Sequence, residues 1–305
     1  MTGYVVRRLA QSLLTLLLVA VVIFVILRWI GDPTHLMLPP EATEADRALL
    51  RNQLGLADPI VMQFARFLGK LLQGDLGLSY RFNQPALEVV LGRIGPTLVL
   101  TTAALALGVM VGVPLGIAAA VRKESWVGQV AGVLAILGQS GPPFLFGLLM
   151  VRLFSVELRW LPTSGYGTIS HLAMPTLALG CYAAAGLMRL TRASVSDVLD
   201  AEYVKLARIK GLSETRVIFK HVLSNALLPV ITFAGLQLGI LMGGAVSVEA
   251  IFAWPGMGKL MLDSISGLDF TVVQAAVLVS ALIFTSVNLA IDLLYAVIDP
   301  RIRYG

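Results

Sequence analysis

The sequence has 305 residues, of which 57% are hydrophobic and only 13% charged, and its mean hydropathy is +0.84. A soluble domain carries about 25% charged residues, and a soluble fold of this length could not bury so much apolar surface, so the composition indicates a membrane protein. The net charge of +5 is better explained by basic residues that anchor helix ends on the cytoplasmic side than by nucleic-acid binding.

Metal and disulfide chemistry find little support. Cys181 is the only cysteine, which excludes an intrachain disulfide and a cysteine metal cluster. His35, His171 and His221 lie far apart and show no ligand spacing. We therefore predict no metal site and no cofactor in this chain.

Six apolar stretches are long enough to cross a bilayer, which takes roughly 20 residues at helical rise. In chain order they are 9–27, 97–121, 127–151, 172–188, 222–248 and 270–291. Arg7 and Arg8 precede the first stretch, as in a signal peptide. Its apolar run is too long for one, and Arg28 and Trp29 follow where a small-residue cleavage site would stand, so we expect a retained span.

The basic residues orient these spans. With the N-terminus inside, the short inner segments hold thirteen lysines and arginines and the two short outer loops hold three. The remaining seven lie between Arg28 and Arg93, in a segment too long to weigh strongly. We predict an all-α membrane protein with six helices and both termini on the cytoplasmic side. No internal repeat is visible, so residues 1–305 are expected to form a single transmembrane domain.

The long outer segment, about 29–95, is expected to be structured. Apolar residues recur at helical spacing from Ile60 to Leu71, after the start signal Asp58-Pro59, and predict an amphipathic helix. The sequence GDLG at 74–77 predicts a turn. A small cap packed on the membrane face is the favoured interpretation, and a docking surface for an external partner is the alternative.

The sequence GQSG at 138–141 resembles the serine motif of rhomboid-type intramembrane proteases. Such an enzyme needs a base within hydrogen-bond reach of Ser140, and the three histidines fall in loops or at helix ends. We favour a structural interpretation, in which residues 140–143 (Ser-Gly-Pro-Pro) break the third span.

Three further features have a structural explanation. The segment WPGMGKL at 254–260 lacks the glycine and the Ser or Thr of a phosphate loop, because Ala253 and Leu260 stand at those positions. Asn288 and Asp292 share one face of the sixth span. For Asp292, and for Glu249 at the outer end of the fifth span, structural anchoring is favoured over proton coupling.

The basic segment between the fourth and fifth spans, about 189–221, holds the most distinctive pattern. Residues 196–209 predict a helix, Gly211 is its expected C-cap, and Ser213 can cap a second short helix. Ala207 and Gly211 are small and would let another protein approach the bend closely. A bent helix lying on anionic lipid is the alternative.

This segment resembles the coupling loop of binding-protein-dependent ABC importer permeases, in the version found in the dipeptide, oligopeptide and nickel class. The resemblance rests on EYVKLARIKGLS (202–213) and on H-x-L-x-N-A-x-x-P (221–229). It continues through GDP (31–33), LGLADP (54–59), GDLGLS (74–79), WLPTSG (160–165), IFAWPGMGKL (251–260) and DPRIRYG (299–305). The residues that it assigns to contact with an ATPase are Glu202, Tyr203, Ala207, Arg208, Lys210, Gly211, Leu212, Ser213, His221, Asn225 and Pro229.

The resemblance implies a type I importer permease in the bacterial inner membrane, which does not itself hydrolyse ATP. It implies a second homologous permease, two cytoplasmic ATPases that bind ATP and Mg²⁺, and an extracytoplasmic binding protein. Di- or oligopeptides are the expected cargo. Glutathione and nickel are alternatives, and FSVELRWLPTSG and GLSETRVIFKH look especially like glutathione-type permeases. Outside the family, a proton-coupled transporter and an intramembrane protease remain as alternatives.

Overall fold

The computed structural model describes residues 2–30, 38, 42–53, 55–123 and 125–298. Helices make up all the regular elements in these ranges. They are α1 (Thr2–Ile30), α3 (Glu44–Gln53), α4 (Ile60–Leu72), α5 (Ala86–Val121), α6 (Trp126–Ser140), α7 (Pro143–Met150), the π-helix η1 (Val151–Glu157), α8 (Ile169–Leu199), α9 (Glu202–Ile209), α10 (Glu214–Arg216), the π-helix η2 (Val217–Val222), α11 (Leu223–Ile251), α12 (Met257–Ser266) and α13 (Phe270–Ile298).

The described residues contain five helices long and apolar enough to span a membrane: α1, α5, α8, the continuous helix Glu214–Ile251 and α13. The predicted third span is a bent pair of helices, one ending at Ser140 and the next beginning at Pro143, which meet at 98°. The expected break is therefore confirmed, and six spans are obtained when the bent pair counts as one. Several helices extend beyond the predicted stretches, since hydropathy marks only the part that lies in hydrocarbon.

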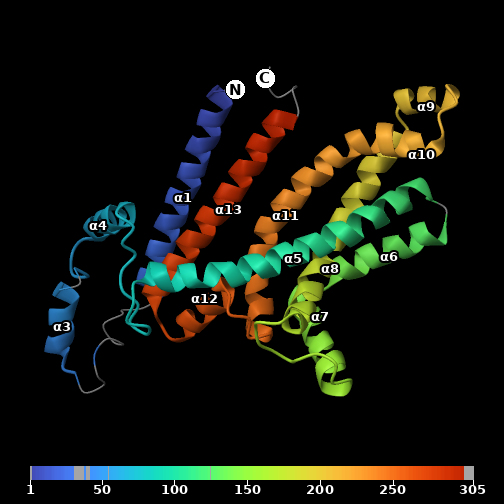
Figure 1. The fold of residues 1–305 in the computed structure, drawn as a ribbon. Helices are drawn as coiled ribbons and strands as arrows, with labels where there is room; N and C mark the ends of the chain where they lie inside the picture. The colour runs from blue at the N-terminus through green and yellow to red at the C-terminus, as the bar shows by residue number, and fades with distance from the viewer. Residues whose placement is uncertain (1, 31–37, 39–41, 54, 124, 299–305) are drawn as a thin grey trace.

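The ends of the molecule agree with the predicted topology. In Figure 1 the start of α1, the end of α13 and the short helix α9 lie at one side, whereas α7 and α12 lie at the other. Helices α1 and α13 pack side by side through a cluster that includes Ala20, Ile23 and Val273. The start of α1, the end of α13 and the segment between the fourth and fifth spans thus lie on one side, as the N-in and C-in arrangement requires.

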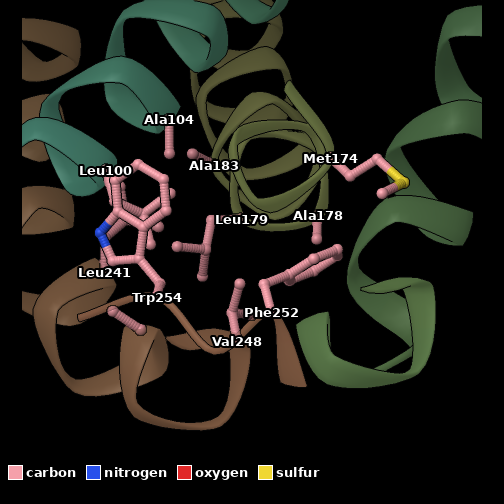
Figure 2. Close-up of a cluster of buried hydrophobic side chains, with 11 residues drawn as sticks. Leu100, Ala104, Met174, Ala178, Leu179, Ala183, Leu241, Val248, Phe252 and Trp254 are labelled. Carbon is pink, nitrogen blue, oxygen red and sulfur yellow. The ribbon is translucent and has the colours of Figure 1, made fainter. Parts of the chain in front are cut away.

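The core lies where α5, α8 and α11 meet. Figure 2 shows Leu100 of α5, Leu179 of α8 and Leu241 of α11 converging on Trp254 and Phe252, which follow α11. Helices α5 and α8 pack closely, because a methyl group on Gly108 or Gly112 would lie within 2.8 Å of α8 atoms. Small residues four apart on a helix let two membrane helices approach in this way.

Helix α4 of the outer segment packs on α1. Phe24 of α1 contacts Phe64 and Phe67 of α4 with ring centroids 5.2 and 5.6 Å apart, which confirms the amphipathic helix. The predicted turn is also present, since the Gly77 N–H donates to Asp75 Oδ1 at 2.8 Å. Helix α5 begins at Ala86, earlier than the predicted end of the segment at 95.

Candidate functional site

The site begins where α8 ends. The predicted helix over 196–209 is wrong, because α8 runs to Leu199 and α9 starts only at Glu202. Ala201 between them is extended (φ −69°, ψ 144°), and its carbonyl accepts the first N–H bonds of α9 from Val204 and Lys205. No Gly or Pro marks this break. It follows from tertiary packing, since Val195 of α8 and Val204 of α9 lie in the same buried cluster.

The inner face of α9 is buried. Val204 and Ala207 pack with Ala120 of α5 and with Val217 and Val222 of η2. Ala207 is only 6% exposed. The expectation that Ala207 lets another protein approach is therefore wrong, since its methyl group is used inside the chain.

The turn after α9 closes as predicted. Gly211 has a φ of +77°, in the left-handed region, and its N–H donates to the Arg208 carbonyl at 2.9 Å. The Leu212 N–H reaches back to the Ala207 carbonyl at 3.3 Å. Together these two bonds form a Schellman motif, and Leu212 adds its apolar contact by packing on the buried cluster. Gly211 is required here because this backbone conformation disfavours a Cβ.

A bidentate ion pair closes the same turn from outside. Arg208 donates from Nε and Nη2 to the two carboxylate oxygens of Glu214, at 3.1 and 2.6 Å. The Glu214 carboxylate raises the pKa of the Arg208 guanidinium. On the first turn of α9, the hydrogen bond from Lys205 lowers the pKa of Glu202. The turn is thus held by groups that stay charged over the physiological range of pH.

The chain after the turn is not a second short helix, which corrects the prediction. Residues 214–251 form one continuous helix that runs from α10 through η2 into α11. Ser213 stands at the N-cap position with an extended backbone, but its side chain makes no capping hydrogen bond. Its carbonyl instead accepts from the Val217 N–H at 3.0 Å. Pro229 lies inside α11, away from the turn.

Three of the predicted residues come together where α9 meets this helix. The Asn225 amide donates to the Tyr203 hydroxyl at 3.2 Å and to the His221 carbonyl at 3.1 Å. The bond to Tyr203 ties α9 to α11, and the half-buried His221 contributes only its backbone carbonyl. Lys210, on the other side of the turn, is exposed.

The sequence analysis included Tyr203 but missed three exposed apolar residues near it in the sequence, Leu206, Ile209 and Phe219. Ile209 is 80% exposed, Phe219 is 69% exposed, and Leu206 and Tyr203 are also exposed. We call Tyr203, Leu206, Ile209 and Phe219 the outer patch. Its signal was present in the sequence, since α9 carries one apolar pair at 204 and 207 and a second at 206 and 209, on a different face. An exposed apolar patch of this kind is typical of a protein interface.

The serine motif is not a protease centre. The Ser140 hydroxyl donates to the Ile136 carbonyl at 2.6 Å. Of the two histidines in the described ranges, His171 contacts Thr168 at the start of α8 and His221 lies in η2. Neither lies beside Ser140, so the chain offers no base there among the residues that the structure describes.

The segment that resembles a phosphate loop wraps around a carboxylate of the chain itself. Glu249 is fully buried, and Oε2 accepts the Lys259 N–H at 3.0 Å. A Cβ on Gly256 would lie 2.1 Å from Glu249 Oε1, so only glycine allows this close approach. Asp292 pairs with Arg8 of α1 at 3.3 Å, whereas Arg301 and Arg303 lie outside the described residues. Both contacts agree with structural anchoring.

Comparison with known proteins now decides the family. Residues 112–304 match the family described as "Binding-protein-dependent transport system inner membrane component", and residues 1–101 match the N-terminal membrane-component family of the same systems. The chain belongs to the inner-membrane permeases of binding-protein-dependent transport systems. The permease is therefore a multi-pass component of the inner membrane and carries out no catalytic reaction of its own.

Relatives and solved structures agree. The permease is 45% identical to the glutathione transport system permease protein GsiC of Salmonella paratyphi A and 43% identical to that of Escherichia coli, over all of both chains. It superposes on a chain of the inward-facing MetNI methionine ABC transporter with a TM-score of 0.57 and 16% identity, covering 69% of this chain and 96% of the other. It superposes on a chain of an amino acid ABC transporter with a TM-score of 0.52 and 16% identity, covering 70% of this chain and 94% of the other. These two structures show the fold alone, which is that of an ABC importer permease.

Proposed function

We propose that this permease and a second, homologous permease form the translocation path of an importer for glutathione. The observation that carries the proposal is the 45% identity to permeases named for glutathione transport, which extends over every residue of both chains. Glutathione is itself a tripeptide, so the cargo stays within the peptide class that the sequence predicts. Di- and oligopeptides, the first expectation from sequence, become the alternative cargo.

Energy enters this permease through protein contact. The sequence has no phosphate loop, so ATP and Mg²⁺ are bound by two separate cytoplasmic ATPases, and a binding protein outside the membrane delivers the cargo. The outer patch supports an ATPase contact, because its four residues are apolar and exposed, and the exposed Lys210 and Lys220 directly follow Ile209 and Phe219 in the sequence. Apolar residues of this kind form the buried centre of an interface, and charged residues form its rim.

The residues around the turn then divide into two groups. Ala207, Gly211 and Leu212 fix the shape of the turn from within, and the exposed ion pair between Arg208 and Glu214 closes it from outside. Tyr203, Leu206, Ile209 and Phe219 present the contact surface. Because the helix from Glu214 is continuous with the fifth span, a displacement of the turn moves that span directly.

Reconstitution of the whole complex tests this function. The two permeases, the ATPases and the purified binding protein are placed in proteoliposomes, and uptake of labelled glutathione, a dipeptide and Ni²⁺ is compared. We expect ATP-dependent uptake of glutathione and stimulation of ATP hydrolysis by the loaded binding protein. Uptake of the dipeptide without glutathione would overturn the cargo, and uptake driven by a proton gradient without ATPases would overturn the division of labour.

A further inference from the structure

The break between α6 and α7 leaves irregular backbone at mid-membrane depth. A Cβ on Gly138 would lie 2.9 Å from the Ala185 Cβ and 3.1 Å from the Cys181 carbonyl oxygen of α8. Cys181 lies at the middle of the apolar stretch 172–188 of the fourth span, and Ala185 lies one turn nearer its inner end. The 98° bend that follows (Figure 1) is therefore far from both membrane surfaces.

The two prolines at the bend remove hydrogen-bond donors. Pro142 and Pro143 have no N–H, so the carbonyls of Gly138 and Gln139, four residues earlier, lack their helical partners. Ser140 and Pro142 are also exposed on the surface of the chain. Exposed irregular backbone is not stable in contact with lipid, and it persists at this depth only against protein or water.

Two glutamine side chains lie on helices that pack around the break, since α6 packs on α8 and α11 packs on α7. A Cβ on Gly186 would lie 3.1 Å from Gln139 Nε2 and 3.3 Å from the Phe233 ring of α11. One helical turn beyond Phe233, Gln237 is only 2% exposed, and its Nε2 has no hydrogen-bond partner among the described residues. A buried amide without a partner is a typical position for an internal water.

We propose that the α6–α7 break lines the aqueous path by which cargo crosses the middle of the membrane. The carbonyls of Gly138 and Gln139 and the Ser140 hydroxyl oxygen accept hydrogen bonds from the N–H and ammonium groups of a peptide-like solute, and the Gln139 amide N–H groups donate to its carbonyl and carboxylate oxygens. Water takes these places between cargo molecules. This assignment rests on the proposed function, in which a peptide-like solute passes between two permeases.

Cysteine accessibility in the assembled complex tests the path. In a Cys181→Ala background, Ser140→Cys is compared with Val133→Cys, which is two turns earlier on α6 and 55% exposed among apolar neighbours. Each is treated with a membrane-impermeant methanethiosulfonate, and labelling is read on this subunit. A thiol ionises and reacts only where water reaches it, so we expect Ser140→Cys to react roughly tenfold faster or more. Loaded binding protein with ATP is expected to slow this reaction, since cargo occupies the path.

The outcomes separate this assignment from the proposed cargo. Equal labelling rates at the two positions would overturn the path. So would a Ser140→Cys thiol that crosslinks to the second permease and is not labelled by the reagent. In both cases glutathione uptake stays intact. If the complex imports another peptide instead of glutathione, the rate difference and its suppression by that peptide support the path, and only the cargo is wrong. A rate at Ser140→Cys that no imported cargo changes would also overturn it.

Discussion

The Thr97 hydroxyl donates a 2.6 Å hydrogen bond to the Glu249 carboxylate and so joins α5 to the end of α11. The same Thr97 oxygen accepts the Met257 N–H at 2.8 Å, and Glu249 accepts the Lys259 N–H. The start of α12 is thereby held against both long helices. One buried carboxylate organises the side of the molecule opposite α9.

Removal of that carboxylate should destabilise the permease. Glu249→Ala leaves the Thr97 hydroxyl and the Lys259 N–H buried without an acceptor, at a cost of about 3 kcal/mol. Glu249→Gln keeps one acceptor and should cost less. Thermal unfolding in detergent measures both, and Glu157→Ala, which removes an exposed ion pair with Arg152, is the control with little expected effect. Equal stability of Glu249→Ala and the control would contradict the anchoring role.

A methyl group at Gly256 should act on the same contact from the other side. Gly256→Ala places a Cβ 2.1 Å from Glu249 Oε1, so the loop or the carboxylate must move and stability should fall. Gly69→Ala is the matched control, because a Cβ there meets nothing within 4 Å and alanine favours the helix α4. Thermal midpoints of the two variants should move in opposite directions. If both thermal midpoints fall by a similar amount, the close approach of Glu249 is not the reason that glycine is needed at position 256.

Substitution of Gly211 tests the backbone conformation of the turn without adding a steric clash. A Cβ at Gly211 meets nothing within 4 Å, so only its φ of +77° resists substitution. Gly211→Val should cost roughly 1 kcal/mol or more, which leaves the spans inserted but displaces the turn. We expect uptake to fall and ATP hydrolysis to lose its response to loaded binding protein. Gly211→Asn is the control, since asparagine tolerates this conformation. If ATP hydrolysis in Gly211→Val still responds normally to loaded binding protein, Gly211 has no role in coupling.

The outer patch should be needed for assembly with the ATPases. Ile209→Glu places a charge in the centre of the proposed interface and should release the ATPases from the affinity-purified complex. Ile169→Glu is the matched control, because Ile169 is 86% exposed at the other end of α8. Crosslinking from a cysteine at Phe219 gives a second readout of the contact. Retention of the ATPases by Ile209→Glu with unchanged crosslinking would favour a helix that lies on lipid.

The topology can be tested by labelling in whole cells. In a Cys181→Ala background, Gln73→Cys should react with an impermeant maleimide from outside, and Ser213→Cys should react only after the membrane is opened. The basic residues on the inner segments are the reason for this expectation. Reaction of Ser213→Cys in intact cells would reverse the orientation.

The spans and the turn could be read from the sequence because each depends on local chemistry. Uninterrupted apolar length predicts α1 and α13, the prolines at 142 and 143 predict the break, and Gly211 predicts the left-handed turn. The size of the bend could not be predicted, because it depends on how α6 and α7 pack on α8.

The errors have a common physical cause. The boundary between α8 and α9 at Ala201 is set by burial of Val204 and Ala207 against other helices, and no residue at the boundary predicts it from sequence. Ser213 looks like a cap, yet tertiary packing joins α10 to α11 and leaves its hydroxyl unused. The bond between Thr97 and Glu249 links segments far apart in sequence, which no local pattern can reveal.

The continuous helix from Glu214 to Ile251 also has a mechanical consequence. Its 38 residues, which include the π-helix η2 and Pro229, follow a path of about 57 Å at α-helical rise, from the turn that follows α9 to the end that carries Glu249. A tilt of about one degree about the inner end therefore displaces the outer end by about 1 Å over that length. This helix therefore acts as a lever arm. A small displacement of the turn at one membrane surface is enough to make or break hydrogen bonds at the other.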